Sequence, residues 1–181
     1  MARIQPLDLD QADPTTRQTL DDVKRKLGTV PNLIATLAHS PTALHGYLGF
    51  ADAATRGRLS AGQREIVALA VAQANSCAYC LAAHTFIGKN AGLDDGQVQA
   101  ARRAEGGSAA DAALARFAAA VVEQRGLIGD DQISALTSAG FDQSVVIEVV
   151  ALVALNTLTN YVNHAADTDI DFPRVDLAAA A

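Results

Sequence analysis

No stretch of useful length in this chain alternates apolar and polar residues as a strand would. Residues 66–72 and 149–155 are instead continuously apolar, and residues 108–125 form an Ala-rich amphipathic pattern. No proline occurs between Pro41 and Pro173, so helices can run through this region without interruption. The pattern predicts an all-α fold.

Helix-capping residues mark where these helices begin and end. Asp13-Pro14 and Ser40-Pro41 each supply an N-cap followed by a first-turn proline, and Ser60 with Gln63 forms a capping box. Ser76 is expected to cap the helix that closes at residues 90–92. The expected helices are 14–27, a short segment at 31–39, 41–57, one that starts after residue 60, 77–90, 94–103, 108–125, 130–138 and 142–164.

The chain resembles itself when it is shifted by 83 residues, and the apolar run after Glu65 then falls on the run after Glu148. The paired positions are Glu65 with Glu148, Cys77 with Asn160, Cys80 with Asn163, and His84 with Asp167. This pattern favours a duplicated helical unit in which only the first copy can perform thiol chemistry. Coincidence in a chain rich in Ala, Leu and Val is the alternative.

The length of 181 residues suits one hydrophobic core, so we expect a single domain over residues 1–181. Half of the residues are apolar and none is Trp, which suits closely packed helices. Long Ala-rich helices with apolar residues on several faces exceed what one small bundle can cover. We therefore expect a homo-oligomer.

Charge and hydropathy exclude several classes of partner. The net charge is −6 and the longest basic run is Lys24-Arg25-Lys26, so a nucleic-acid partner is not expected. The longest apolar runs are much shorter than a membrane span needs, and no signal peptide is recognised at the start of the sequence. Two cysteines in a CxxC pair fit a reducing compartment, so we expect a cytoplasmic protein without a membrane partner.

The candidate chemistry lies between residues 65 and 84. On a helix, Cys77, Cys80 and His84 are spaced i, i+3 and i+7 and share one face, with both sulfurs near the first turn. A helix N-terminus favours a thiolate, and a nearby imidazole can accept or return a proton. The pattern predicts a redox pair that closes a small, reducible disulfide.

Other interpretations of these residues remain open. The cysteines could be small buried hydrophobes, or Cys77, Cys80, His84 and Glu65 could bind zinc, although zinc sites usually add a ligand pair from elsewhere in the chain. Glu65 alone could be a helix carboxylate favoured by the dipole.

The full motif, Glu65-x11-Cys77-x2-Cys80-x3-His84, resembles the signature of the AhpD-type alkylhydroperoxidase family within the carboxymuconolactone decarboxylase-like superfamily. Residues 27–41, 59–85 and 160–173 are similar to its peroxidase-related branch. The resemblance implies an AhpD-like multi-helical bundle that assembles as a dimer, trimer or hexamer. It implies a thiol-dependent peroxidase or disulfide reductase without a cofactor or bound metal, which uses a hydroperoxide substrate and a lipoamide-like dithiol or a peroxiredoxin partner.

The resemblance also implies roles for the four residues. Glu65, acting through His84 and a water, would help to ionise Cys80, and Cys77 would condense with the sulfenic acid formed on Cys80. Helix-end electrostatics alone favour Cys77 as the more acidic thiol, so the order of attack stays open. Tyr79 stands where some family members carry histidine, which removes a second proton donor.

Two functions of other classes remain. The superfamily also contains decarboxylases that lack a CxxC, and a non-catalytic helical assembly protein is the third possibility. Thiol chemistry would vanish when both cysteines are replaced, whereas a decarboxylase or a scaffold would survive.

Overall fold

A computed structural model describes residues 1–177, so the last four residues of the expected 1–181 domain lie outside the described part. Residues 1–177 contain helices and no strand, which confirms the all-α class. The elements are η1 (Leu9–Gln11), α1 (Pro14–Leu27), α2 (Asn32–Leu37), α3 (Pro41–Ala54), α4 (Ala61–Ala74), α5 (Ala78–Asn90), α6 (Asp95–Arg102), α7 (Ala109–Glu123), α8 (Asp130–Ser138) and α9 (Gln143–Ala166).

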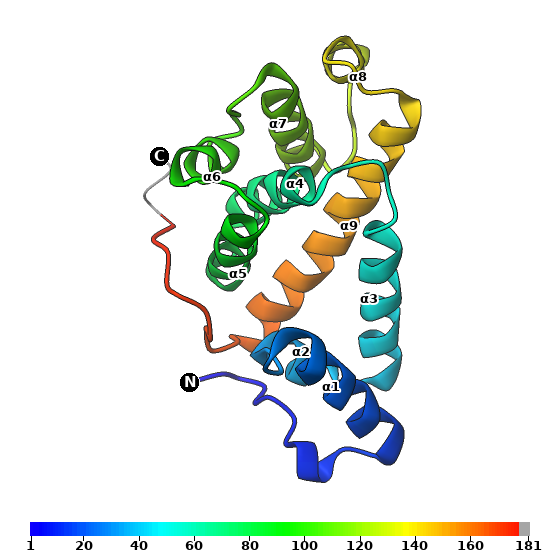
Figure 1. The fold of residues 1–181 in the computed structure, drawn as a ribbon, viewed down its shortest axis with the longest axis vertical. Helices are drawn as coiled ribbons and strands as arrows, with labels where there is room; N and C mark the ends of the chain where they lie inside the picture. The colour runs from blue at the N-terminus through cyan, green and yellow to red at the C-terminus, as the bar shows by residue number, and fades with distance from the viewer. Residues whose placement is uncertain (178–181) are drawn as a thin grey trace.

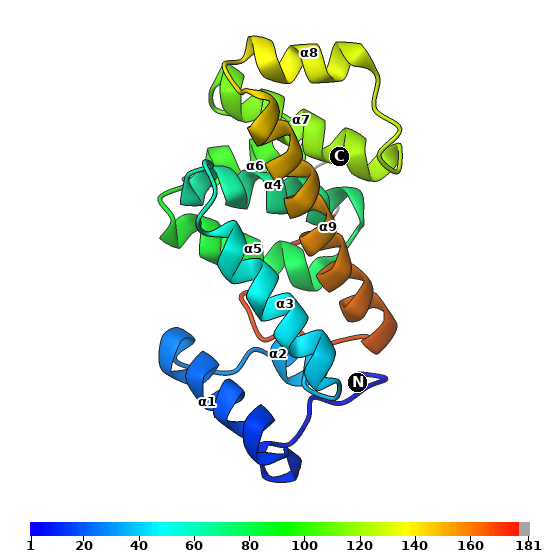
Figure 2. The same ribbon diagram turned by 90° about the vertical axis from the view of Figure 1, so that its right-hand side faces the viewer.

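Helix α4 lies at the centre of the molecule, where it contacts α5, α6, α7 and α9 (Figure 1). Its residues from Ile66 to Ala72 are all buried, as their continuously apolar sequence predicts. Helix α9 crosses α4 and also contacts α2 and α3. Helices α8 and α1 lie at opposite ends of the molecule (Figure 2). The sequence from Glu65 to His84 therefore belongs to the central helix and its direct neighbour α5.

The expected caps are present at most helix ends. The Asp13 side chain accepts hydrogen bonds from two first-turn amides of α1, and Ser60 and Gln63 form the expected capping box. Four helices end earlier than expected, and two of these, α2 and α6, end at Leu37 and Arg102 instead of residues 39 and 103. The helix expected over 41–57 ends at Ala54, and the helix expected over 108–125 ends at Glu123, because Arg125 adopts a left-handed backbone with φ of 55°.

The expected cap at Ser76 is wrong, because α4 and α5 are joined by a tighter link than capping rules suggest. The Cys77 amide donates to Ala72 O at 2.9 Å and the Ser76 amide donates to Gln73 O at 2.9 Å, which is the Schellman pattern of a helix C-terminus. That pattern requires a left-handed residue, and Ser76 supplies it with φ of 53°. Cys77 therefore both completes the end of α4 and serves as N-cap of α5.

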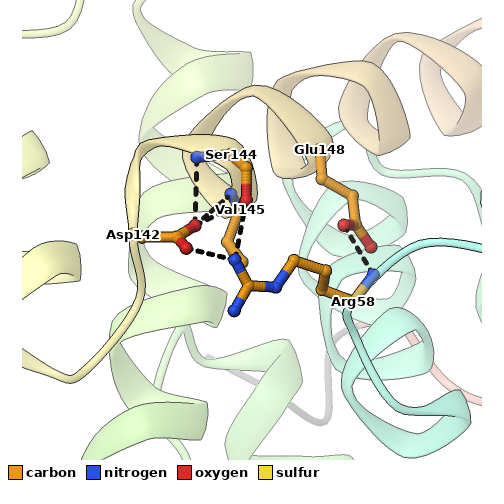
Figure 3. A network of polar contacts seen from close by, with 5 residues as sticks. All are labelled: Arg58, Asp142, Ser144, Val145 and Glu148. Atoms are coloured by element: carbon orange, nitrogen blue, oxygen red, sulfur yellow. Dashed lines mark hydrogen bonds and ion pairs between the residues drawn. The ribbon is translucent and has the colours of Figure 1, made fainter.

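The two halves related by the 83-residue shift differ in local structure. The first consists of α4, the link and α5, whereas the second is the continuous helix α9. Glu148, the counterpart of Glu65, accepts a hydrogen bond from the backbone amide of Arg58 at 2.8 Å (Figure 3). It also accepts one from the Leu59 amide at 3.1 Å. Arg58 also pairs with Asp142 at the start of α9. Glu148 thus fixes the loop that leads into α4.

Helix α9 is long and apolar enough to cross a membrane by length and composition alone, with a mean hydropathy of 1.8. Half of that apolar window is buried inside the molecule, where it serves the helical core. Its exposed side carries an apolar stripe spaced i, i+3, i+11 and i+14, which we call the α9 stripe. The stripe consists of Ile147, Val150, Leu158 and Tyr161.

The segment after α9 runs back across the molecule towards α6 (Figure 1). Arg102 is buried and donates to the backbone oxygens of Asp176 and Leu177, at 2.6 and 3.3 Å. The Phe172 ring packs edge-on against Tyr79, with centroids 5.8 Å apart. These contacts place the C-terminal segment over the first turns of α5.

Candidate active site

The two cysteines lie at the junction of α4 and α5, where Cys77 is the N-cap and Cys80 lies in the first turn of α5. Cys77 Sγ accepts a hydrogen bond from the Cys80 amide at 3.4 Å. Both are free thiols, and they are only 1% and 2% exposed. The sulfurs are therefore close to each other and shielded from bulk solvent.

The two thiols have opposite pKa shifts. The hydrogen bond with Cys77 is the largest cause that lowers the pKa of Cys80 to about 6, against burial, which raises it. The His84 charge and the amides of Asn163 and Asn160 lower it further. The hydrogen bond to Cys80, followed by burial, raises the pKa of the Cys77 thiol. The site therefore favours a Cys80 thiolate that accepts a hydrogen bond from a neutral Cys77 thiol.

Glu65 and His84 form an ion pair between α4 and α5. His84 Nδ1 lies 2.8 Å from Glu65 Oε2, and the two side chains are 20% and 16% exposed. Burial lowers the pKa of His84, but the charge and hydrogen bond of Glu65 outweigh it, so the pKa lies above its usual value. A protonated His84 then stabilises the Cys80 thiolate through its positive charge.

Helix α9 contributes site residues that were not assigned a role from the sequence. Asn163 Nδ2 donates to Cys80 Sγ at 3.2 Å, and the Asn160 backbone oxygen lies 4.0 Å from Cys77 Sγ. Thr159 lies 3.9 Å from Cys80 Sγ through its hydroxyl. The 83-residue shift already paired Cys77 with Asn160 and Cys80 with Asn163, and these partners contact each other in space. That internal pairing was the signal that could have found them.

Cys80 and His84 line a cavity of about 430 Å³, which we call the Cys80 cavity. Most of its wall is apolar or aromatic and comes from α2, α3, α5 and the C-terminal segment. Its aromatic residues are Tyr47, Tyr79, Phe86 and Phe172.

Tyr79 positions part of this wall. Its hydroxyl accepts a hydrogen bond from the Leu33 amide at 3.2 Å, which ties α5 to α2. Burial raises the pKa of Tyr79, and it therefore stays a neutral phenol that supports the cavity from within.

Within residues 1–177, no three His, Cys, Asp or Glu side chains are arranged to hold a metal ion. Glu65 is engaged with His84, and the cysteines are engaged with each other and with α9. The geometry therefore gives the zinc interpretation no support.

Comparisons with known proteins agree with this architecture. Residues 41–124 match the model of the Carboxymuconolactone decarboxylase family, and this span contains Glu65, Cys77, Cys80 and His84. The sequence matches none of the curated proteins it was compared with.

Several solved structures share the whole fold. An uncharacterized peroxidase-related protein from Ralstonia eutropha JMP134, described as an alkylhydroperoxidase AhpD core, is 24% identical with a TM-score of 0.86, covering 94% of this chain and 92% of that chain. A peroxidase-related protein from Silicibacter sp. TM1040 is 25% identical with a TM-score of 0.80, covering 92% and 91%. The debrominase Bmp8, in complex with 2,3,4-tribromopyrrole, is 20% identical with a TM-score of 0.79, covering 93% and 91%.

Proposed function

Because this chain belongs to the AhpD-like family of the carboxymuconolactone decarboxylase superfamily, we propose that it is a thiol-dependent peroxidase that reduces hydroperoxides through Cys80 and Cys77. The proposal rests above all on one observation. Cys80 has a lowered pKa and lies beside His84 on the wall of an apolar cavity. A thiolate is the nucleophilic form of cysteine, and this one is formed near neutral pH.

In the first step, the Cys80 thiolate attacks the terminal oxygen of a hydroperoxide. The S–O bond forms, the O–O bond breaks, and the departing alkoxide takes a proton from the His84 imidazolium to leave as an alcohol. Glu65 holds His84 in place and keeps it protonated before the step. Cys80 is thereby oxidised by two electrons to a sulfenic acid.

In the second step, the Cys77 sulfur attacks the Cys80 sulfenic acid. A disulfide forms, and the hydroxide that leaves takes the Cys77 proton and departs as water. A dithiol then reduces the disulfide and is itself oxidised to a disulfide, which restores both thiols. The lower pKa of Cys80 supports this order, because the more acidic thiol attacks first and the neutral thiol resolves.

The walls of the Cys80 cavity favour an apolar hydroperoxide over hydrogen peroxide. Burial, together with the negative charges of Cys80 and Glu65, raises the pKa of Tyr47 to about 12. Tyr47 therefore stays protonated in the cavity and can donate a hydrogen bond to the bound peroxide.

A second candidate is reductive removal of a halogen from an aromatic ring, the activity named for Bmp8. The aromatic wall formed by Tyr79, Phe86 and Phe172 favours a flat ring in the Cys80 cavity. The electron balance is the same, because two thiols become a disulfide while the carbon–halogen bond becomes carbon–hydrogen and halide leaves.

We place this activity in the cytoplasm, in a homo-oligomer supplied with electrons by a lipoamide-like dithiol or a peroxiredoxin partner. The exposed α9 stripe supports the assembly, because an apolar surface of this kind is usually covered by a second chain.

A coupled assay tests the proposal. The purified protein is mixed with cumene hydroperoxide and dihydrolipoamide, and peroxide loss is followed with time. We expect turnover that is lost in Cys80→Ser and Cys77→Ser and reduced about 10²–10⁴-fold in His84→Gln. His45→Gln, on the exposed side of α3, is the matched histidine control.

The same assay separates the alternatives. Peroxide turnover that survives both cysteine replacements would refute the thiol mechanism, and no turnover in the unmodified protein would favour the decarboxylase or assembly interpretation. Bromide release from 2,3,4-tribromopyrrole without peroxide loss would favour dehalogenation over peroxide reduction.

A further inference from the structure

The two cysteines line different cavities. Cys80 lines the Cys80 cavity, and Cys77 lines a separate cavity of about 400 Å³, which we call the Cys77 cavity. Tyr79, between them in sequence, contributes to both walls. The remaining wall of the Cys77 cavity comes from the N-terminal segment, the α4–α5 link and the end of α9. The pair can therefore be approached from two sides.

We propose that the Cys77 cavity is the entry site for a small polar dithiol that reduces the Cys77–Cys80 disulfide by attacking Cys77. This inference rests on the proposed function, since it concerns the step that resets the disulfide. It assigns the peroxide and the reductant to opposite sides of the cysteine pair.

The geometry of thiol–disulfide exchange supports this assignment. The attacking sulfur, the attacked sulfur and the leaving sulfur lie close to a line, so a thiolate that attacks Cys77 must approach from the side away from Cys80. The Cys77 cavity includes Cys77 in its wall and not Cys80. A reductant that attacked Cys80 would instead have to enter the Cys80 cavity, which the hydroperoxide uses.

Reduction of the Cys77–Cys80 disulfide takes place in two displacements at sulfur. The first thiolate of the dithiol bonds to Cys77 Sγ, the Cys77–Cys80 bond breaks, and Cys80 leaves as a thiolate. The second thiolate of the dithiol then attacks the dithiol sulfur that is bonded to Cys77. The dithiol closes into a cyclic disulfide, the bond to Cys77 breaks, and Cys77 takes up a proton. A more acidic thiol leaves faster, and Cys80 is the more acidic of the pair.

The lining of the Cys77 cavity indicates a polar ligand. Asn163 and Thr168 line it and are 4% and 8% exposed, and Asn163 Oδ1 and Thr168 Oγ1 have no hydrogen-bond partner among the described residues. Such buried polar atoms are costly unless a ligand or water satisfies them.

The N-terminal segment closes one side of this cavity. The Arg3 amide donates to Ala166 O at 2.7 Å, and its guanidinium donates to the backbone oxygen of His164 at 2.9 Å. These bonds hold Arg3 against the end of α9. The volume of about 400 Å³ suits a small molecule.

Two obstructing variants and one control test the assignment. Ala78→Phe places a ring in the Cys77 cavity, Thr29→Trp does so in the Cys80 cavity, and Ala53→Phe adds the same ring as Ala78→Phe at an exposed site that lines neither. Each protein is oxidised with diamide, which makes the disulfide without peroxide. Stopped-flow mixing with dihydrolipoamide gives the reduction rate, and mixing reduced protein with cumene hydroperoxide gives the oxidation rate.

We expect Ala78→Phe to lower the ratio of reduction to oxidation rate by at least about tenfold and Thr29→Trp to raise it. Ala53→Phe should leave both rates at wild-type values. Equal effects of the two obstructing variants on reduction, or a greater effect of Thr29→Trp, would overturn the assignment. Failure to form a disulfide with diamide would overturn both this inference and the proposed function.

The attacked sulfur is identified independently. Oxidised protein is mixed with N-acetylcysteine, quenched in acid, alkylated and sequenced by tandem mass spectrometry. We expect the mixed disulfide on Cys77 and the alkyl group on Cys80. A mixed disulfide on Cys80 would refute the entry site even if peroxide turnover is observed. The expected adduct without any peroxide activity would instead refute only the proposed function.

Discussion

The contact between Asn163 and Cys80 allows the electrostatics of the site to be tested quantitatively. Asn163 Nδ2 donates to Cys80 Sγ at 3.2 Å, and both side chains are almost fully buried. A hydrogen bond to a charged group contributes about 1.5–3 kcal/mol, and one pKa unit corresponds to about 1.36 kcal/mol. Asn163→Leu should therefore raise the pKa of Cys80 by about 1–2 units from its value of about 6.

The fold should tolerate this change, because Asn163 Oδ1 is itself buried without a partner among residues 1–177. Leu removes that unsatisfied oxygen and keeps the same branched shape. Asn163→Asp should raise the pKa of Cys80 further, because it places a second negative charge beside the thiolate. Asn90→Leu, at the exposed end of α5, is the matched control and should leave the pKa unchanged.

The assay follows thiolate absorbance near the ultraviolet edge and the alkylation rate of Cys80 against pH. Cys77→Ser serves as the background, because serine keeps a hydroxyl that can donate to Cys80. In this background the pH at which half of Cys80 is ionised should be lowest with Asn163, higher with Leu at this position and highest with Asp. Superimposed profiles for the three proteins would refute the claim that α9 stabilises the thiolate.

Three further predictions test other parts of the structure. Glu65→Gln should lower the unfolding free energy by about 1–3 kcal/mol below pH 6.5, and this loss should shrink as pH rises through the raised pKa of His84. Urea unfolding at several pH values measures it. Gly57→Ala should lower the unfolding free energy by about 1–3 kcal/mol, because the added Cβ would lie 2.2 Å from Glu148 Oε1. In a Glu148→Ala background the same substitution should cause no further loss. Ile147→Glu, at a position 69% exposed in the α9 stripe, should lower the molar mass measured by light scattering, and an unchanged mass would exclude this surface from the assembly.

Local sequence rules predicted the parts of the fold that depend on neighbouring residues. The capping box at Ser60, the buried run after Ile66 and the clustering of Cys77, Cys80 and His84 all follow from spacing along one helix or two adjacent helices. The same rules placed the cap of α5 at Ser76, one residue too early, because the C-terminal motif of α4 uses that residue in a left-handed conformation.

Contacts between distant segments could not be predicted in this way. Asn163 reaches Cys80 from 83 residues away, and the Tyr79 hydroxyl meets the Leu33 amide on α2. Such contacts depend on how α9 and α2 pack against α5, which a local pattern does not contain. The order of the two thiols was open because spacing does not show which thiol donates to the other, and because the amides of Asn160 and Asn163 that also favour a Cys80 thiolate come from α9.

Trapping the first oxidised sulfur tests the central claim most directly. Cys77→Ser and Cys80→Ser proteins are each exposed to one equivalent of cumene hydroperoxide in the presence of dimedone, and the adducts are mapped by tandem mass spectrometry. The account predicts a dimedone adduct on Cys80 in the Cys77→Ser protein and none on Cys77 in the Cys80→Ser protein, because only Cys80 has the lowered pKa beside His84. An adduct on Cys77 alone, or none in either protein, would contradict it.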